Sequence, residues 1–353
     1  MKPVLLLVLI FLLAATIACR REENDAPKGR AVYYWRTTLR LSPYEKEFLE
    51  SGGIETVYLH LFDVVRREEG LGPANSLLFH DTLPKDIEIE IIPTIFIDPG
   101  ALSQPDSADS LASAIINRCD RMLTENGYSR PEEIQIDYDW TGSDRVHYFR
   151  LLEKARDIMH RRGGRLSTTV RIHQLSQPAP PADYGALMVY NVGNITDPDE
   201  NNSILNLRIV DRYIGALREY RLPLATALPV YSWNIVFSDD RFKAIAHSLD
   251  VRDTAMFRPV DSIHYRAMHY GPLAMAGKRD GSGGRIFPGD IVRHESVSPA
   301  VLETVLERII KIRPGSAGRV IIYHLDEKSL RQYDQHFLQK ILGGSSRQPS
   351  RHL

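Results

Sequence analysis

The residues with the clearest chemical potential in this chain are two aspartates one residue apart, in the segment QIDYDWTG at positions 135–142. Side chains alternate between the two faces of a strand, so Gln135, Asp137 and Asp139 share one face. Two acids held side by side on a rigid strand repel each other, and such pairs suit general acid and base catalysis. The alternative is a pair of solvated acids at the end of a strand.

A second polar strand follows at residues 166–173, with the sequence LSTTVRIH. If its alternate apolar residues face helices, Arg171 and His173 point to the same side as the aspartates. Consecutive parallel strands are usually neighbours, so we expect Arg171 and His173 beside Asp137 and Asp139. Burying these charges is costly unless they are used or fully paired. We expect a functional site here; a satisfied salt-bridge network is the alternative.

Aromatic and polar residues near the ends of other strands suit a sugar ligand, because aromatic faces close to carboxylates can stack on sugar rings. The alternative for each aromatic residue is that its side chain only fills the barrel interior or the layer between the barrel and the helices. By the same alternation, the strand at residues 56–63 turns Tyr58, His60 and Phe62 inward. The predicted catalytic residues are Asp139 and Asp137. The predicted substrate-binding residues are Gln135, Arg171, His173, Asn191, Tyr231, Trp233, Trp35 and His60.

Eight strand-like runs position these residues, and helical patterns lie between most of them. The runs are residues 31–36, 56–63, 87–98, 133–140, 166–173, 186–191, 223–233 and 319–326. The predicted helices are residues 42–52, 108–126, 143–162, 207–220, 239–249 and 298–312. Alternating strands and helices predict a parallel sheet, and eight strands in one domain predict a (β/α)₈ TIM barrel. A doubly wound open sheet is the alternative, although the first strand is not followed by a glycine-rich phosphate turn.

The spacing of the elements is irregular between the seventh and eighth strands. Residues 251–295 form a long excursion with a glycine-rich tip at residues 277–284. We expect an extended hairpin that projects over one end of the barrel, because long loops after strands usually belong to function. A disordered surface loop is the alternative.

Charge and histidine spacing argue against several function classes. The formal net charge is −1 with both signs well mixed, so we expect no nucleic-acid partner. The histidines lack HxH or HExxH spacing, and no GxSxG elbow or Cys-His signature is present. The sequence therefore predicts neither a metal site nor a cofactor.

The first residues predict export. Met1-Lys2 is followed by an apolar run and then by Thr16-Ile17-Ala18-Cys19, which is typical of a signal peptide. A Cys directly after Ala18 resembles a bacterial lipoprotein signal, which implies that Cys19 is lipidated; an ordinary secretory signal is the alternative. No Asp follows Cys19, which by the same resemblance favours the outer membrane. We divide the chain into a signal peptide (1–18), a flexible tether (19–30), the barrel domain (31–342) and a disordered tail (343–353).

Two resemblances bear on activity. Residues 132–141 (EEIQIDYDWT) resemble the fourth-strand signature DxxDxDxE of family 18 glycoside hydrolases, the chitinase-like barrels. The resemblance places Asp139 on the last acid of the signature, Asp137 on its third Asp and Gln135 on its second. Over most of the mature chain, the blocks YYWRTT, QIDYDWT, TVRIHQ, MVYNVG and ALPVYSW are similar to those of a family of bacterial lipoproteins of unknown function.

Together these observations predict a lipid-anchored barrel that acts on an extracytoplasmic carbohydrate, with Asp139 as general acid and Asp137 as its support. Asp63, Asp98 and Asp326 are candidates for a second catalytic carboxylate. A non-catalytic glycan-binding lipoprotein is the rival interpretation. It is favoured by two departures from the signature, Asp139 in place of its Glu and Gln135 in place of its second Asp. An assembly factor that docks through residues 251–295 is a third.

Overall fold

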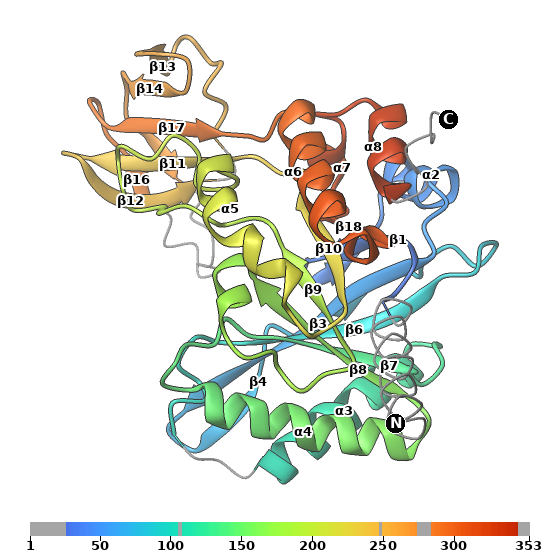
Figure 1. Ribbon diagram of the computed structural model, residues 1–353. Coiled ribbons are helices and arrows are strands. Elements are labelled where there is room, and N and C mark those ends of the chain that lie inside the picture. Colours follow the sequence, from blue (N-terminus) through green and yellow to red (C-terminus); the bar gives the residue numbers. More distant parts are fainter. Residues whose placement is uncertain (1–25, 105–107, 247–248, 274–283, 345–353) are drawn as a thin grey trace, which may run out of the picture.

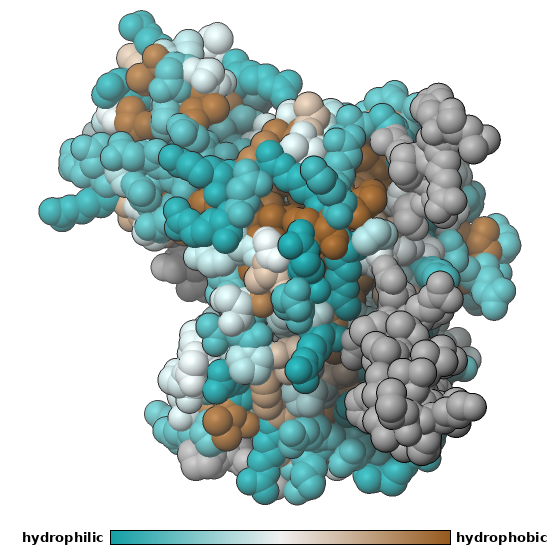
Figure 2. Space-filling view, in the orientation of Figure 1, coloured by the Kyte–Doolittle hydropathy of each residue, from teal (hydrophilic) through white to brown (hydrophobic). Residues whose placement is uncertain are grey.

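The computed structural model describes residues 26–104, 108–246, 249–273 and 284–344. The predicted signal peptide, Cys19 and most of the predicted tether and tail lie outside these residues. No helix within them is long and apolar enough to span a bilayer. Hydrophilic residues cover most of the face seen in Figure 2, with smaller hydrophobic areas among them.

Within the described residues, eight parallel strands close into a barrel (Figure 1). They are β1 (Gly29–Tyr34), β3 (Thr56–Arg67), β6 (Glu90–Ile97), β7 (Glu133–Asp137), β8 (Arg165–Arg171), β9 (Tyr184–Met188), β10 (Leu224–Pro229) and β18 (Arg319–Tyr323). β1 pairs with β18 on one side and β3 on the other, which closes the sheet. The predicted (β/α)₈ barrel and its eight strands are confirmed, and the open sheet is excluded.

Amphipathic helices cover the barrel. They are α2 (Pro43–Ser51), α3 (Ala108–Glu125), α4 (Arg145–Arg161), α5 (Leu207–Ile214), α6 (Pro299–Ile312), α7 (Glu327–Leu330) and α8 (Gln335–Leu342). Helix α2 begins with a capping box between Ser42 and Glu45. The predicted helix 207–220 is divided into α5 and the 3₁₀ turn η2 (Gly215–Arg218). Two further 3₁₀ turns are η1 (Ile172–Ser176) and η3 (Pro314–Ala317).

Short strands extend the first part of the barrel. The strand β4 (Gly70–Ala74) pairs antiparallel with the long end of β3, and β2 (Thr38–Leu39) pairs with β5 (Leu78–Phe79). The segment between the second and third barrel strands thus has short strands and no helix.

The excursion between the seventh and eighth barrel strands is present, but it is larger than predicted and is not a hairpin. An antiparallel sheet projects to one side of the barrel (Figure 1). It consists of β11 (Trp233–Ser238), β12 (Arg241–Ala246), β13 (Phe257–Pro259), β14 (His264–Ala267) and β17 (Ile291–Glu295), beside the pair β15 (Gly271–Leu273) and β16 (Gly284–Ile286). We call residues 233–295 the insert. A separate apolar cluster that includes Val236, Phe257 and Val292 forms its core.

The predicted helix at residues 239–249 is wrong, because residues 241–246 form the strand β12. Asp239 and Asp240 both have positive φ, at 48° and 58°, and Ser238 pairs with Arg241 across them. Two consecutive left-handed residues make a tight hairpin turn whose twist matches the strands it joins. The two aspartates therefore connect β11 to β12 instead of starting a helix.

A buried ion pair joins the insert to the barrel. Arg293 and Glu295 on β17 have fully buried side chains, and Nε of Arg293 lies 2.7 Å from Oε1 of Glu295. Oε2 of Glu295 accepts hydrogen bonds from the Ser203 backbone N at 2.9 Å and from Nε1 of Trp233 at 2.8 Å. Because both charges are removed from water, each depends on these partners.

Replacing Arg293 with Leu should lower the free energy of unfolding by about 3–5 kcal/mol, because Glu295 would keep a buried charge without its counterion. Urea denaturation followed by circular dichroism measures this. Arg308→Met is the matched control, since Arg308 pairs with Asp211 at the surface and should contribute less than about 1 kcal/mol. Equal losses in the two variants would contradict the prediction.

Candidate functional site

A buried ion pair occupies the barrel interior where β7 and β8 end. Asp137 is 3 % exposed. Its Oδ1 accepts hydrogen bonds from Oγ1 of Thr169 at 2.5 Å and from Nη2 of Arg171 at 3.0 Å. The parallel register of β7 and β8 sets Gln135 beside Ser167 and therefore Asp137 beside Thr169. The expected juxtaposition of Asp137 and Arg171 is found.

Asp139 lies beyond the strand, because β7 ends at Asp137. Its side chain is 48 % exposed, and Oδ1 lies 3.7 Å from Nε2 of His173. His173 belongs to the turn η1 and not to a strand. Asp139 therefore stands at the rim of the barrel next to His173, while Asp137 is enclosed below it.

Sequence reasoning missed Gln174, which holds this rim together. Its side chain is buried, and its Nε2 donates to Oδ1 of Asp139 at 3.3 Å and to the Trp140 carbonyl at 3.0 Å. Its Oε1 accepts from the backbone N of Arg171 at 2.8 Å. Gln174 thus ties the loop after β7 to the end of β8. Its only signal in the sequence is its place just after the polar strand.

Among the described residues, the buried polar groups without a hydrogen-bond partner include Nε2 of Gln135 and the hydroxyl of Tyr190. Gln135 accepts from the Tyr33 hydroxyl at 2.8 Å, but its Nε2 is unpaired. The hydroxyl of Tyr190, just after β9, is buried and unpaired, and its ring stacks on Tyr323 at 4.8 Å. Burial raises the pKa of Tyr190 well above its ordinary value, so its hydroxyl stays a hydrogen-bond donor. The Tyr190 hydroxyl, which lines a cavity at the barrel mouth, can receive a polar ligand or water.

Two cavities open at the mouth of the barrel. The first, which we call the acid cavity, has a volume of about 630 Å³ and contains Asp139, Arg171, His173 and Tyr190 in its wall. The second, the aromatic cavity, has a volume of about 450 Å³. Its wall includes Trp35, Tyr231, Trp233, Tyr323, Asp326 and Lys328.

Asn191 lines both cavities. Its φ is +54°, in the left-handed region. Its Oδ1 accepts a hydrogen bond from the Tyr231 hydroxyl at 2.5 Å. Asn191 therefore stands where the two cavities meet.

The aromatic residues predicted from the sequence converge on the second cavity. The rings of Tyr231 and Trp233 meet at 5.4 Å, and Trp35 lies 5.9 Å from Tyr323. Trp233 is the first residue of β11 and not the last of the seventh barrel strand, so the insert supplies it. Offset rings with open faces suit stacking against sugar rings.

His60 lines neither cavity. It is buried, its ring lies 4.7 Å from that of Trp35, and its Nε2 forms a hydrogen bond with Oδ1 of Asp63 at 2.7 Å. It supports Trp35 from below. The expected inward position of Phe62 is wrong, because the register with β6 shifts between His60 and Phe62. This bulge turns Phe62 toward Arg118 of α3.

The three candidates for a second carboxylate line no part of the acid cavity. Asp63 is held by His60 and Asn75. Burial and the nearby Asp63 raise the pKa of Asp98. Asp326 lies at the aromatic cavity, where it caps α7 through the Ser329 backbone N. In the described part of the chain, no group of three or more His, Cys, Asp or Glu side chains could hold a metal ion.

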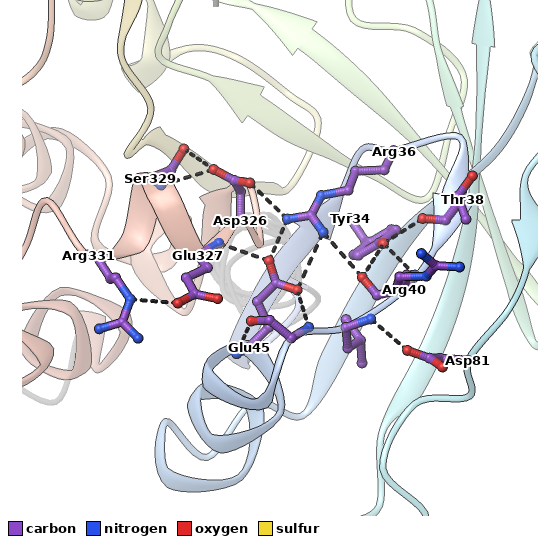
Figure 3. Close-up of polar contacts among 12 residues, drawn as sticks. Tyr34, Arg36, Thr38, Arg40, Glu45, Asp81, Asp326, Glu327, Ser329 and Arg331 are labelled. Carbon is purple, nitrogen blue, oxygen red and sulfur yellow. Dashed lines mark hydrogen bonds and ion pairs between the residues drawn. The ribbon is translucent and has the colours of Figure 1, made fainter. Parts of the chain in front are cut away.

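Figure 3 shows how Asp326 is tied to the barrel rim. Nη2 of Arg36 lies 2.8 Å from Oδ1 of Asp326 and also contacts Glu45, the buried residue of the α2 capping box. Burial alone would raise the pKa of Asp326, but the Ser329 hydroxyl hydrogen bond and the charges of His324 and Arg36 hold the pKa below its ordinary value. Asp326 therefore stays ionised and braces the wall of the aromatic cavity.

Solved structures with the same architecture include chitinases and a spore cortex-lytic enzyme. The spore cortex-lytic enzyme SleL of Bacillus megaterium QM B1551 is 10 % identical over 90 % of this chain and 74 % of its own, with a TM-score of 0.53. The chitinase of Chromobacterium violaceum ATCC 12472 is 12 % identical over 91 % of this chain and 100 % of its own, with a TM-score of 0.52. The Group IV chitinase of Ostrinia furnacalis is 8 % identical over 91 % of this chain and 100 % of its own, with a TM-score of 0.51.

This chain has a chitinase-like barrel fold. At these identities the likeness extends to the fold alone. No protein-family model matches the chain, and no curated protein matches it.

Asp326→Asn should lower stability at pH 7 by about 0.5–1 kcal/mol, because the partly exposed ion pair with Arg36 is lost. The folded-state pKa of Asp326 is depressed, so its contribution is present above the unfolded value of about 3.9 and is lost as the pH falls through the folded value. The difference between wild type and Asp326→Asn should therefore vanish in acid, as urea denaturation at several pH values can measure. Asp326→Ala also removes the N-cap of α7, which should lower the free energy of unfolding by about 1 kcal/mol more. A difference for Asp326→Asn that does not change with pH would contradict this.

Proposed function

We propose that this protein is a glycoside-hydrolase-like protein that binds a carbohydrate across the two mouth cavities and cleaves it in the acid cavity. The observation that carries the proposal is the position of Asp139. Its half-exposed carboxylate stands in a cavity with Arg171 and Tyr190, and the adjoining cavity is lined by aromatic rings. This combination suits a sugar polymer better than a small apolar ligand.

In this proposal Asp139 is the general acid that protonates the departing glycosidic oxygen. Gln174 and His173 orient its carboxylate through the contacts at 3.3 and 3.7 Å. Asp137 stays paired with Arg171 below the mouth, where a fixed negative charge can stabilise the positive charge that develops on the sugar.

The remaining wall residues would bind the sugar. The Tyr190 hydroxyl lines the acid cavity and is a buried donor that a sugar oxygen can pair, whereas Gln135 lines neither cavity. Trp35, Tyr231 and Trp233 offer stacking faces, and Asn191 lies between the two cavities. The names of the similar structures, two chitinases and a spore cortex-lytic enzyme, support carbohydrate as the ligand class.

A glycan-binding protein without turnover is the second candidate. It is favoured by the same ion pair, because Thr169 and Arg171 hold the Asp137 carboxylate in place below the mouth. The two candidates share the cavities and differ only in the chemistry at Asp139.

Purified protein incubated with chito-, cello- and xylo-oligosaccharides and with peptidoglycan fragments should release shorter products, measured by mass spectrometry. Asp139→Asn should lower the rate by about 10²–10⁴-fold, as loss of a general acid does, while calorimetric affinity changes little. Asp157→Asn, an exposed residue of α4, is the control and should be unchanged. Binding without products in both wild type and Asp139→Asn would indicate the glycan-binding candidate. If the wild type shows neither binding nor products, both candidates are refuted.

We further propose that the protein is a bacterial lipoprotein held at an extracytoplasmic membrane face, in the outer membrane, through a lipid on Cys19. The signal pattern before Cys19 and the absence of an Asp after it support this. Cys119, the other cysteine, is buried against the barrel in α3 and is unavailable for such a modification.

Cys19→Ala expressed in a Gram-negative host should move from the membrane fraction to the soluble periplasmic fraction, as immunoblotting of separated fractions can measure. Cys119→Ala is the control and should stay with the wild type. Unchanged membrane retention of Cys19→Ala would refute lipid anchoring.

A further inference from the structure

The acid cavity contains a second carboxylate that sequence reasoning did not select. Of the acidic side chains in the described residues, Asp139 and Glu200 line this cavity. Glu200 lies in the loop between β9 and α5, here called the β9–α5 loop, residues 189–206. Asp63, Asp98 and Asp326, which the strand ends suggested, lie elsewhere.

Glu200 is oriented through one of its two oxygens. Oε1 accepts hydrogen bonds from Nδ2 of Asn206 at 2.9 Å and from the backbone N of Asn201 at 3.1 Å. Among the described residues, no hydrogen bond is made to Oε2. One oxygen is thus oriented by the loop and the other has no hydrogen-bond partner, as a carboxylate that is to receive a proton requires.

Gly193 makes room for this carboxylate. A Cβ added at Gly193 would stand 2.8 Å from Oε2 of Glu200 and 2.8 Å from the Cα of Ser203. The backbone N of Gly193 also donates to the Ser203 carbonyl at 3.1 Å, which closes the loop around Glu200. The close approach needs a residue without a side chain.

The insert holds the β9–α5 loop on both sides of Glu200. Before it, Nη1 of Arg293 donates to the Asp197 carbonyl at 2.6 Å. After it, Oε2 of Glu295 accepts from the Ser203 hydroxyl at 2.7 Å and from the Ile204 backbone N at 3.2 Å. The buried ion pair thus fixes the position of the loop that presents Glu200.

Asp139 and Glu200 reach the acid cavity from different elements. Asp139 follows β7, and Glu200 lies in the loop after β9, with β8 between these strands. In glycosidases that invert the anomeric carbon, one acid protonates the departing oxygen while the other activates a water molecule.

We propose, resting on the function proposed above, that Glu200 is the second catalytic carboxylate and acts as the general base. Glu200 takes a proton from a water molecule as the water oxygen bonds to the anomeric carbon. The bond from that carbon to the glycosidic oxygen breaks, and Asp139 gives its proton to the departing oxygen. One water is consumed, both products carry hydroxyl groups, and solvent returns the two acids to their starting states.

The test uses the purified wild-type protein, the oligosaccharide that it cleaves in the panel above, and the 2,4-dinitrophenyl glycoside of the same sugar. Glu200→Gln should lower kcat by about 10²–10⁴-fold on both substrates. Asp139→Asn should lose activity on the oligosaccharide but keep most of it on the dinitrophenyl glycoside, whose leaving group needs no proton. Sodium azide should restore turnover to Glu200→Ala by replacing the activated water.

Asp199 is an exposed neighbour of Glu200 in the same loop. Asp199→Asn is therefore the matched control, and its kcat on both substrates should equal that of wild type. Gly193→Ala keeps both acids but crowds the Glu200 carboxylate, and should lower kcat with an unchanged affinity for the oligosaccharide. If Glu200→Gln fails to fold by circular dichroism, Gly193→Ala and Glu200→Asp carry the test. Proton NMR of the first product should show inversion at the anomeric carbon.

The outcomes separate the two proposals. Hydrolysis that depends on Asp139 but is within twofold of wild type in Glu200→Gln would overturn the role of Glu200 and leave the proposed function standing. Retention of anomeric configuration would overturn its role as base. If wild type cleaves no member of the panel, the proposed hydrolase activity falls, and the role of Glu200 falls with it.

Discussion

The site depends on one constraint: charges enclosed in the barrel must find partners in the neighbouring strand. Near one end of β7, Glu133 accepts from the Ser167 hydroxyl at 2.7 Å and lies 3.0 Å from Nη2 of Arg165. At the other end, Asp137 is paired with Arg171. Burial raises the pKa of Glu133, so these partners offset a real cost of desolvation. A slip of one residue would turn both acids into the helix layer, and the ion pairs therefore reinforce the register.

The insert also contains a buried charge that depends on partners from other elements. The carboxylate of Glu295 is bound at once by Trp233, which lines the aromatic cavity, and by Ser203, which belongs to the loop at the acid cavity. The two halves of the mouth are thus fixed by a single buried anion and its counterion Arg293. An insert of this kind is part of the site's framework and not a separate module attached to its edge.

The sequence was sufficient for the barrel and for the central acids, because alternation along a strand is a local pattern. It placed Asp137 beside Arg171, since that contact follows from the pairing of consecutive strands. It failed where a single residue changes the pattern. The bulge after His60 turned Phe62 outward, and the left-handed pair Asp239-Asp240 made a hairpin where a helix was expected. Gln174 and Glu200 escaped notice because they lie outside strands, and their positions depend on contacts distant in the sequence.

Asn191 shows what the mouth demands of its backbone. A residue with a side chain costs about 1 kcal/mol in the left-handed region, where glycine is comfortable. Glycine at this point would relax the turn, yet it would remove the amide that accepts from Tyr231 at the junction of the two cavities. At position 191, glycine would therefore favour thermal stability, whereas asparagine favours ligand recognition. A more heat-resistant form of this protein obtained by relaxing that turn would lack the direct hydrogen bond between position 191 and Tyr231.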